Sequence, residues 1–412
     1  MNDRQPEAVE LVEYVPKLFP RGHIDELEQL LVEHYRDQID IEAPGYRTGG
    51  LWRLTAKGWA GYIPLTAEFG LRLQPKVEIG NLFRMLEYAY RLRDPSFRFL
   101  DDLIGCQTLD DYYERLANVL AKRVLDRGRK GFYRDYLGRD EQLPYVRGRL
   151  DVAHSAVQPW DVRPHCQYQE HTADIEENQL LAWTLWDITR RGVCTERVLP
   201  TVRQAYRSLQ GLASLQPFPP AACTGRRYNR LNEDYHPLHA LCRFFLEQTG
   251  PSHRQGDRQV LPFLVNMESL FEMFVAEWLK ANLPPRWAVR AQEHHVVGDG
   301  KGPQFDIDLV LYDMELGVVR CVLDTKYKAP ETPANTDISQ VVTYAELKGC
   351  YEAVLIYPTS LPSALDARVG QKIRVRSLTF SLAGDLEQAG CQFIGELLGG
   401  LDATPLTPPT TM

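Results

Sequence analysis

A strand-like segment that ends in charged residues, VVRCVLDTKYK (318–328), holds the side chains best suited to chemistry. Its first half is apolar on nearly both faces, which is typical of a central strand covered on both sides. Asp324 and Lys326 follow two residues apart, so their side chains project from one face. Charges at the end of a buried strand lie where the sheet opens into a cleft. Lys328 shares that face and is a rival for the role of Lys326.

The segment before it, FDIDLVLYD (305–313), offers carboxylates on a neighbouring strand. Its alternation predicts that Asp306 and Asp308 project from one face. The other face would then carry the apolar residues Phe305, Ile307 and Leu309. One carboxylate from this strand and Asp324 from the next can share a cation. We expect Asp308 to be that carboxylate, with Asp306 as its rival.

Two carboxylates on adjacent strands are a sufficient protein contribution to a Mg²⁺ site. Mg²⁺ takes oxygen ligands and keeps several waters, so Asp308, Asp324 and a substrate phosphate can complete it. A bound metal lowers the pKa of a water and neutralises charge on the phosphate. Lys326, as a fixed cation, can orient that water or stabilise the transition state. The expected chemistry is phosphodiester hydrolysis with Mg²⁺, for which Mn²⁺ is a plausible substitute.

Two helical segments carry candidate supporting residues. In MESLFEMFVAEWLK (267–280), Glu268 and Glu272 lie four apart on the flank of an apolar stripe. Glu272 can therefore reach the same metal or its water, or it can simply be solvated.

The second helical segment begins near Asp337, a candidate N-cap. Gln340 and Tyr344 lie one turn apart in it and can hold a phosphate or the catalytic lysine.

This succession of a helix glutamate, a strand aspartate, an Asp-x-Lys triplet and a helix Gln-x-x-x-Tyr resembles the PD-(D/E)xK nuclease superfamily. The segments LFEMFVAEWL, DIDLVLYD, VLDTKYK, DISQVVTYA and LIYP resemble the McrC family in particular. Upstream segments such as LRLQPKVEIGNLFRMLEYAY (71–90) are also similar to it, so the resemblance covers nearly the whole chain. By this resemblance, Asp308, Asp324 and Lys326 are catalytic and Gln340 supports them. Where the family has proline before the first aspartate, this chain has Ile307.

The resemblance also implies partners. McrC proteins act with McrB, a hexameric AAA+ GTPase that recognises methylated DNA, and they stimulate its GTP hydrolysis. The expected function is that of an endonuclease subunit in phage defence, cutting double-stranded DNA that carries a modified cytosine such as 5-methylcytosine. The chain has no G-x-x-x-x-G-K-[ST] phosphate loop, and GDGKGPQ (298–304) lacks the spacing. GTP is therefore expected only through the partner.

Two other functions fit the same residues. One is a stand-alone DNA nuclease similar to RecB or Cas4, although the cysteine cluster of an iron–sulfur version is missing. The other is a non-catalytic activator of an AAA+ partner, against which the intact Asp and Asp-x-Lys set argues.

Composition places the chain among ordinary globular proteins. It has 412 residues, 44% of them hydrophobic and 25% charged, and a net charge of −8. This charge has the wrong sign for a protein that coats nucleic acid, so any DNA contact must be local or shared with a partner. The eight cysteines show no zinc spacing and are expected to be free thiols, mostly buried. No apolar run is long enough for a membrane span, and the start does not resemble a secretory signal, which favours a cytoplasmic location without a membrane partner.

The elements that must position these residues suggest a multidomain α/β protein. Residues 1–100 read as a β-rich, partner-facing domain that ends in a helix at 81–92, and residues 101–255 as a helical middle domain. Residues 256–400 follow the order helix, strand, strand, strand, helix, strand, which predicts a mixed central sheet. By resemblance, residues 256–400 are the PD-(D/E)xK restriction-endonuclease-like domain. Residues 401–412 should be a loose tail.

A basic stretch in the middle domain is a candidate contact for DNA or the partner. Nine basic and four acidic residues lie between Lys122 and Arg149, interleaved with aromatic residues. Such a strip can follow a DNA backbone, approach a partner's nucleotide, or be a solvated helix face. The candidate contacts are Arg127, Arg129, Lys130, Arg134, Arg147 and Arg149, with Tyr344 from the C-terminal domain.

Overall fold

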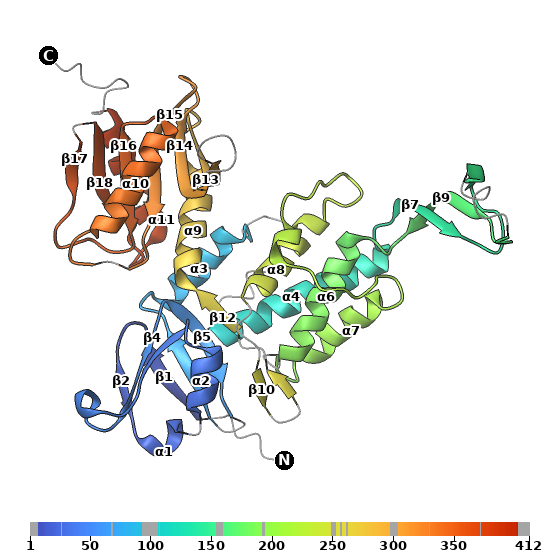
Figure 1. Ribbon diagram of the computed structural model, residues 1–412, viewed down its shortest axis with the longest axis horizontal. Coiled ribbons are helices and arrows are strands. Elements are labelled where there is room, and N and C mark those ends of the chain that lie inside the picture. The colour runs from blue at the N-terminus through green and yellow to red at the C-terminus, as the bar shows by residue number, and fades with distance from the viewer. Residues whose placement is uncertain are drawn as a thin grey trace.

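The computed structural model describes residues 7–25, 27–66, 69–92, 106, 108–153, 160–191, 194–248, 253–255, 258–260, 263–296, 304–328, 330–370 and 372–402. Most of the expected tail, residues 403–412, and the glycine-rich segment 298–303 therefore lie outside the described residues. In Figure 1 the C-terminal region lies above the N-terminal region, and the helical region extends away from both.

The N-terminal region is β-rich, as expected from its glycine-broken strands. Its two sheets have the strand orders β1-β6-β5-β12 and β2-β4-β3. The bounds are β1 Glu7–Val12, β2 Lys17–Phe19, β3 Ile39–Glu42, β4 Trp52–Ala56, β5 Trp59–Pro64 and β6 Phe69–Gln74, with the short helices α1 Arg21–Ile24, α2 Glu28–His34 and η1 Tyr46–Thr48. Alternate residues of β4 are buried, which is typical of a sheet that packs one face on a core.

One strand of the first sheet comes from much later in the chain. β12 (Phe263–Asn266) pairs antiparallel with β5, with Val265 opposite Ala60. It continues directly into α9 (Met267–Asn282), whose N-cap Asn266 accepts hydrogen bonds from the Glu268 and Ser269 amides. The expected boundary near residue 256 therefore precedes a strand that belongs to the N-terminal sheet.

The middle region is helical at its core, as the sequence predicts. Its helices are α4 Leu109–Lys130, α6 Glu176–Arg191, α7 Leu199–Leu209, η3 Pro220–Cys223 and α8 Tyr235–Glu247. Thr108 caps α4 through a reciprocal capping box with Asp111. The sequence did not predict the β-arm that projects from these helices in Figure 1, formed by β7 Asp135–Gln142, β8 Arg149–Leu150 and β9 His165–Thr172. A short hairpin, β10 His253–Gln255 and β11 Arg258–Val260, follows α8.

The C-terminal region is a mixed sheet between helices, with the order β13-β14-β15-β16-β18-β17. Its bounds are β13 Trp287–Val296, β14 Gln304–Asp313, β15 Val318–Thr325, α10 Asn335–Lys348, β16 Glu352–Tyr357, β17 Asp366–Val369, β18 Ile373–Thr379 and α11 Leu386–Asp402. β15 is antiparallel to β14 and parallel to β16, and its residues 321–324 are buried. The predictions of a mixed sheet and of a doubly covered strand at 318–325 are thus confirmed.

Helices cover both faces of this sheet. Val341, Tyr344 and Ala345 of α10 belong to one buried cluster with residues of the sheet. Residues of α9 and α11 pack in a second cluster on the other side, which extends into the middle region. α3 (Ile79–Ala89), the helix expected at 81–92, packs against α9. Both the N-terminal sheet and α3 therefore support the helix that carries Glu272.

Candidate functional site

Asp324 and Lys326 meet at the end of the central strand. The Asp324 side chain is almost fully buried, and Lys326 Nζ lies 2.8 Å from its Oδ2. The Lys326 amide donates to the Ile356 carbonyl over 2.8 Å, which fixes the backbone beside β16. A buried carboxylate is therefore held next to a half-buried ammonium where β15 ends.

Asp308 faces this pair from β14. Its Oδ2 accepts hydrogen bonds from the Thr325 amide at 3.0 Å and from the Thr325 hydroxyl at 3.3 Å. Asp306 instead is exposed and is bonded to His294 at the outer edge of the sheet. Asp308, and not Asp306, lies with Asp324 and Lys326.

The expected alternation along β14 is wrong at Leu309. Phe305 and Ile307 pack in the cluster under α10, but Leu309 belongs to the cluster on the α9 and α11 face. Opposite the break, Gln292 of β13 has a φ of +50° and does not pair with Asp308, although its neighbours pair regularly. The ladder between β13 and β14 is therefore irregular at this position, next to which the side chains of β14 change face.

Lys326 is also supported from α10. Its Nζ donates to Gln340 Oε1 at 3.4 Å, and Gln340 Nε2 donates to the Tyr344 hydroxyl at 2.8 Å. Tyr344 is largely buried and packs edge-on against Phe305, so its hydroxyl is held in place to support Gln340. Asp337 is not the N-cap that we expected, because α10 begins at Asn335 after Ala334. It lies in the first turn, with Oδ1 4.0 Å from Lys326 Nζ.

Glu272 approaches the site from α9. It is half-buried, and Gln292 Nε2 donates to its Oε1 at 3.4 Å. Burial raises the pKa of Glu272 to about 7, and the charges of Asp308 and Asp324 add to the effect. Lys328, by contrast, does not point at the carboxylates, because its Nζ lies 5.2 Å from the centre of the Tyr14 ring in the N-terminal region.

The site holds more negative charge than its one lysine balances. Burial and the nearby Asp308 raise the pKa of Asp324 to about 7, despite Lys326. Burial also raises the pKa of Asp308, although the bonds from Thr325 oppose this. For Lys326, burial lowers the pKa, but the carboxylates of Asp324, Asp337 and Asp308 together outweigh burial and the net shift is upward. Carboxyl groups whose pKa values are raised by burial and by one another are typical of functional sites.

The donor set fits a hard divalent cation that keeps waters. Asp324 Oδ1 has no hydrogen-bond partner among the described residues, and Oδ2 has only the ion pair with Lys326. A buried carboxylate oxygen left without a donor is costly unless a cation or water meets it. Within the described ranges, no group of three His, Cys, Asp or Glu residues is arranged to hold a metal. The carboxylates of Asp308 and Asp324 lie on adjacent strands, and both raise the pKa of Glu272.

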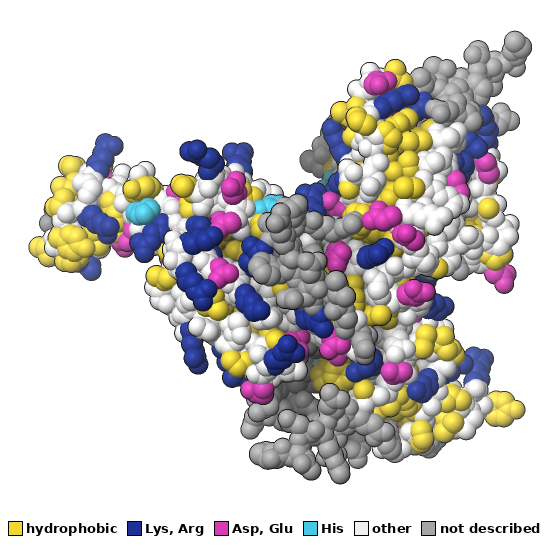
Figure 2. All heavy atoms as spheres, turned by 180° about the vertical axis from the view of Figure 1, so that it is seen from behind, with side chains coloured by type: hydrophobic (Ala, Val, Ile, Leu, Met, Phe, Trp, Pro, Cys, Tyr) yellow, Lys and Arg dark blue, Asp and Glu magenta, His cyan; other side chains and the backbone are white. Residues whose placement is uncertain are grey.

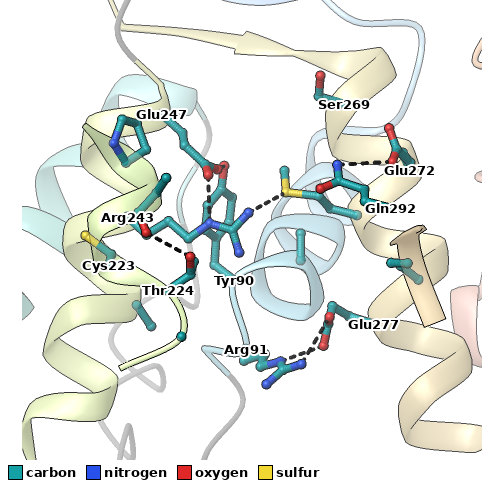
Figure 3. Close-up of a pocket in the computed structure, with 18 of the residues that line it drawn as sticks. Tyr90, Arg91, Cys223, Thr224, Arg243, Glu247, Ser269, Glu272, Glu277 and Gln292 are labelled. Carbon is teal, nitrogen blue, oxygen red and sulfur yellow. Dashed lines mark hydrogen bonds and ion pairs between the residues drawn. The ribbon is translucent and has the colours of Figure 1, made fainter. Parts of the chain in front are cut away.

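A cavity of about 1080 Å³ lies between α8 and α9, beside the site (Figure 3). Glu272 and Gln292 line one end of it, whereas Asp308, Asp324 and Lys326 do not line it. Figure 3 shows that its wall is crossed by ion pairs, Arg91 with Glu277 and Arg243 with Glu247. Because these charges compensate one another, the cavity offers no strong net field to an anion.

A smaller groove of about 500 Å³ runs along α10 on the other side of Lys326. Its wall consists of hydroxyl, amide and aromatic side chains, from Phe305, Asn335, Thr336, Ser339, Gln340, Thr343 and Tyr344. Neutral hydrogen-bonding groups of this kind are common contacts to nucleic-acid phosphates.

The basic stretch divides between α4 and the β-arm. Arg127 faces inward, with its guanidinium bonded to Asp234 and lying over the Tyr235 ring. Arg129, Lys130 and Arg134 are exposed at the end of α4 and just after it. Arg149 lies exposed on β8, and Arg147 lies over the Tyr168 ring in the arm.

The arm carries exposed apolar side chains next to these arginines. Figure 2 shows hydrophobic and basic side chains together at its far end. Large hydrophobic residues exposed on or beside the arm are Tyr136, Tyr145, Val146, Leu150, Val152, Trp160 and Val162. Trp160 is 78% exposed and Val162 94%, and large apolar side chains that gather on a surface in this way mark a candidate interaction site.

Sequence reasoning missed several residues of the site. Thr325 fixes Asp308, but it stands between two more conspicuous charged residues. Tyr357, at the end of β16, is buried, and its hydroxyl has no hydrogen-bond partner among the described residues. Burial raises the pKa of Tyr357, and the negative charges of Asp337 and Asp324 raise it further. Tyr357 lies near Asp324 because β16 pairs parallel with β15, and local sequence does not reveal that pairing.

Other expectations from composition can be compared with the structure. All eight cysteines are free, and six of them are buried, as expected. No helix in the described part of the chain has the length and apolar character needed to cross a membrane.

Comparisons with known proteins agree with the resemblance seen in the motifs. A family model described as McrBC 5-methylcytosine restriction system component matches residues 54–358. A curated relative from Escherichia coli (strain K12), the type IV methyl-directed restriction enzyme EcoKMcrBC, is 24% identical over 222 residues, which are 51% of this chain. The match spans 61% of that relative, less than two thirds of its length.

Solved structures resemble the fold. One is a refined half-complex from a tetradecameric assembly of Thermococcus gammatolerans McrB AAA+ hexamers with bound McrC. The match has a TM-score of 0.54 and 18% sequence identity, and it covers 95% of this chain and 100% of the matched chain. Another is the cryo-EM structure of the Thermococcus gammatolerans McrBC complex, with a TM-score of 0.44 and 18% identity over 68% of this chain and 88% of the other.

Proposed function

The chain belongs to the McrBC 5-methylcytosine restriction system component family, and on this premise we propose that it is the subunit that cuts DNA. The observation that carries the proposal is the buried Asp324, whose Oδ1 lacks a partner among the described residues while Asp308 faces it from the next strand. Two desolvated carboxylates without a matching second cation suit a Mg²⁺-dependent phosphodiester hydrolysis. The proposed substrate is double-stranded DNA with a modified cytosine.

Asp308 and Asp324 would hold Mg²⁺, and Glu272, whose pKa both of them raise, would join them as a further ligand or bind a water of the metal. When bound, Mg²⁺ supplies a water of lowered pKa and neutralises charge on the phosphate. Lys326 stays fixed between Asp324 and Gln340, so its ammonium can stabilise charge on the phosphate oxygens without reorganising. Thr325 holds Asp308 by two hydrogen bonds, which keeps the carboxylates of β14 and β15 in register.

The groove along α10 supports DNA as the substrate. Gln340 both bonds Lys326 and lines this groove, so a phosphate bound there lies next to the lysine. The hydroxyls of Ser339 and Thr343 line the same helix face. Each donates to a backbone carbonyl one turn earlier, and rotation of the hydroxyl would direct it to a phosphate instead. Such neutral contacts fix a DNA backbone in register without requiring a basic protein, which agrees with the net charge of −8.

The β-arm supports a protein partner. Its exposed apolar residues would be unfavourable in water if nothing covered them, and arginines such as Arg149 stand beside them. The proposed partner is a McrB-type AAA+ GTPase hexamer, which would bind the GTP and choose the cutting site. The chain would then also stimulate that partner's GTP hydrolysis.

The test combines the purified chain with the AAA+ GTPase of the same organism. We expect Mg²⁺-dependent cleavage of methylated plasmid only with the partner and GTP, and none with EDTA. Cutting by the chain alone would favour a stand-alone nuclease. GTPase stimulation without cleavage in Mg²⁺ or Mn²⁺ would instead favour a non-catalytic activator.

A further inference from the structure

The residue next to the site lysine is bonded to the N-terminal region. The hydroxyl of Tyr327 donates to Glu13 Oε2 over 2.9 Å, across 314 residues of sequence. Glu13 has no exposed surface, and Tyr327 is also buried. The same Glu13 oxygen accepts a hydrogen bond from the Lys76 amide at 3.2 Å.

Glu13 itself is held firmly by the N-terminal strands. It directly follows β1, its amide donates to the Gln74 carbonyl at 2.9 Å, and it bridges to Ala56 of β4. Backbone bonds on both sides leave it little freedom to follow a moving partner. The bond to Tyr327 therefore transmits the position of the N-terminal sheet to the segment that carries Lys326.

The chemistry of this contact is unusual for mere packing. Glu13 Oε1 has no hydrogen-bond partner among the described residues, so a carboxyl group is buried with only part of its bonding satisfied. A leucine facing a phenylalanine would bury the same area without that cost. A buried polar contact of this kind contributes a defined geometry more than it contributes stability.

A second connection reaches the site from the same sheet. β12 continues into α9, and the Met267 amide donates to the Gly58 carbonyl at 2.9 Å. α9 carries Glu272 on one face and packs Phe271 against the Tyr327 ring, with the ring centres 6.2 Å apart. The N-terminal sheet thus holds both the helix with Glu272 and the segment after Lys326.

We propose that Glu13 is a positioning residue for DNA cleavage, which sets the place of Lys326 through its hydrogen bond to Tyr327. This inference rests on the proposed function, because positioning has a meaning only if Lys326 acts on a phosphate. The N-terminal sheet is then part of the cutting centre, and a displacement of that sheet changes the rate of cutting.

The test uses Tyr327→Phe, which removes one hydroxyl and keeps the ring. In the assembly with partner, GTP, Mg²⁺ and methylated DNA, we expect kcat to fall about tenfold because one buried hydrogen bond is lost. The KM for DNA should stay within about twofold. The matched control is Tyr88→Phe, because the Tyr88 hydroxyl donates to Glu387 at 2.7 Å and links α3 to α11 away from the site. The control should keep kcat within about twofold.

A double-mutant cycle tests the pair itself. Glu13→Ala should lower kcat as Tyr327→Phe does, and the double variant should be no slower than either single one. Glu13→Gln keeps an acceptor oxygen and should recover most of the rate. Losses that multiply in the double variant would show that the two residues act independently and would overturn the proposal.

Hydrogen exchange gives a readout that does not depend on cutting. The amides of residues 325–328 should exchange at least about fivefold faster in Glu13→Ala and Tyr327→Phe, but not in Tyr88→Phe. The positioning role would be overturned if these amides exchanged faster while kcat stayed unchanged. It would also be overturned if neither the exchange rate nor kcat changed. If the wild-type assembly cuts no DNA at all, the proposed function fails, while exchange still decides whether Glu13 holds this segment.

Discussion

Thr325 donates both its backbone amide and its hydroxyl to the same oxygen of Asp308, at 3.0 and 3.3 Å. The residue that fixes Asp308 therefore stands between Asp324 and Lys326 in the chain. Because the amide donor cannot be removed by most substitutions, the spacing of the two carboxylates is largely a property of the backbone. This arrangement makes the carboxylates themselves the informative positions to change.

Asp308→Asn and Asp324→Asn should each lower cleavage by about a thousandfold, since a metal ion contributes several kcal/mol to stabilising such a transition state. Cleavage of methylated plasmid by the complete assembly measures the loss, and assembly with the partner should be unchanged. Asp306→Asn is the control, because its exposed carboxylate faces His294, and it should stay within about threefold of wild type. Equal losses at Asp306 and Asp308 would contradict the site.

Gln340→Ala should lower kcat about tenfold, because Lys326 loses the acceptor that holds it on the α10 side. The partner-dependent assay measures kcat and KM separately, which distinguishes an effect on the lysine from weaker DNA binding. Ser339→Ala, one residue earlier and exposed, should change kcat by less than about twofold. A larger effect from Ser339 than from Gln340 would place the important contact in the groove and not at Lys326.

Asp324→Asn should make the metal-free chain more stable at pH 8 and leave it unchanged at pH 4. The pKa of Asp324 is raised from 3.8 to about 7 in the folded chain, so the folded state keeps a proton that the unfolded state releases. The free energy of unfolding of the wild type therefore falls as the pH rises from about 4 to about 7, and it stays at the lower value above pH 7. In thermal unfolding with EDTA at pH 8, the Tm of the Asp324→Asn variant should be a few degrees higher than that of the wild type. Identical curves at both pH values would mean that Asp324 is not desolvated.

Gly390→Ala should destabilise the chain by about 1–3 kcal/mol through overpacking. A Cβ at Gly390 of α11 would lie 2.1 Å from the Trp278 ring of α9, and Trp278 is fully buried. Gly395→Ala on the same helix meets nothing within 4 Å and should instead stabilise the helix by about 0.5–1 kcal/mol. Urea unfolding of the two variants checks the sign of each change. Two variants of equal stability would mean that α9 and α11 are not in this close contact.

Local sequence predicted the elements that bury strong apolar patterns. The helical middle region, the helix α9 and the central strand β15 lie where their periodicity placed them. The carboxylates and Lys326 were found because charges at the end of an apolar strand are conspicuous. Alternation failed at Leu309, next to a position where the ladder between β13 and β14 is irregular at Gln292 and Asp308, a feature of two paired strands that one segment of sequence does not show.

The β-arm was missed for a physical reason. β7 reads DYLGRDEQ and none of its residues is fully buried, so its strands lack the apolar alternation that marks a sheet packed on a core. Its pairing with β9 is held mainly by backbone bonds and by cross-strand pairs such as Arg139 with Glu170. The bond between Glu13 and Tyr327 was equally invisible, because only the folded chain brings such distant residues together.

The strand order β1-β6-β5-β12 has an evolutionary consequence. The chain leaves this sheet after Gln74 and returns to it at Phe263, so the helical region and its arm lie between two strands that flank β5. The helices share the buried cluster of α9, but the arm leaves them at Asp135 and returns at Thr172, which pair with each other. Insertions with neighbouring ends can be exchanged without disturbing their host. A recombination event that replaced the segment 135–172 would give the lineage a new docking arm, while the helices, the carboxylates and their lysine were inherited unchanged.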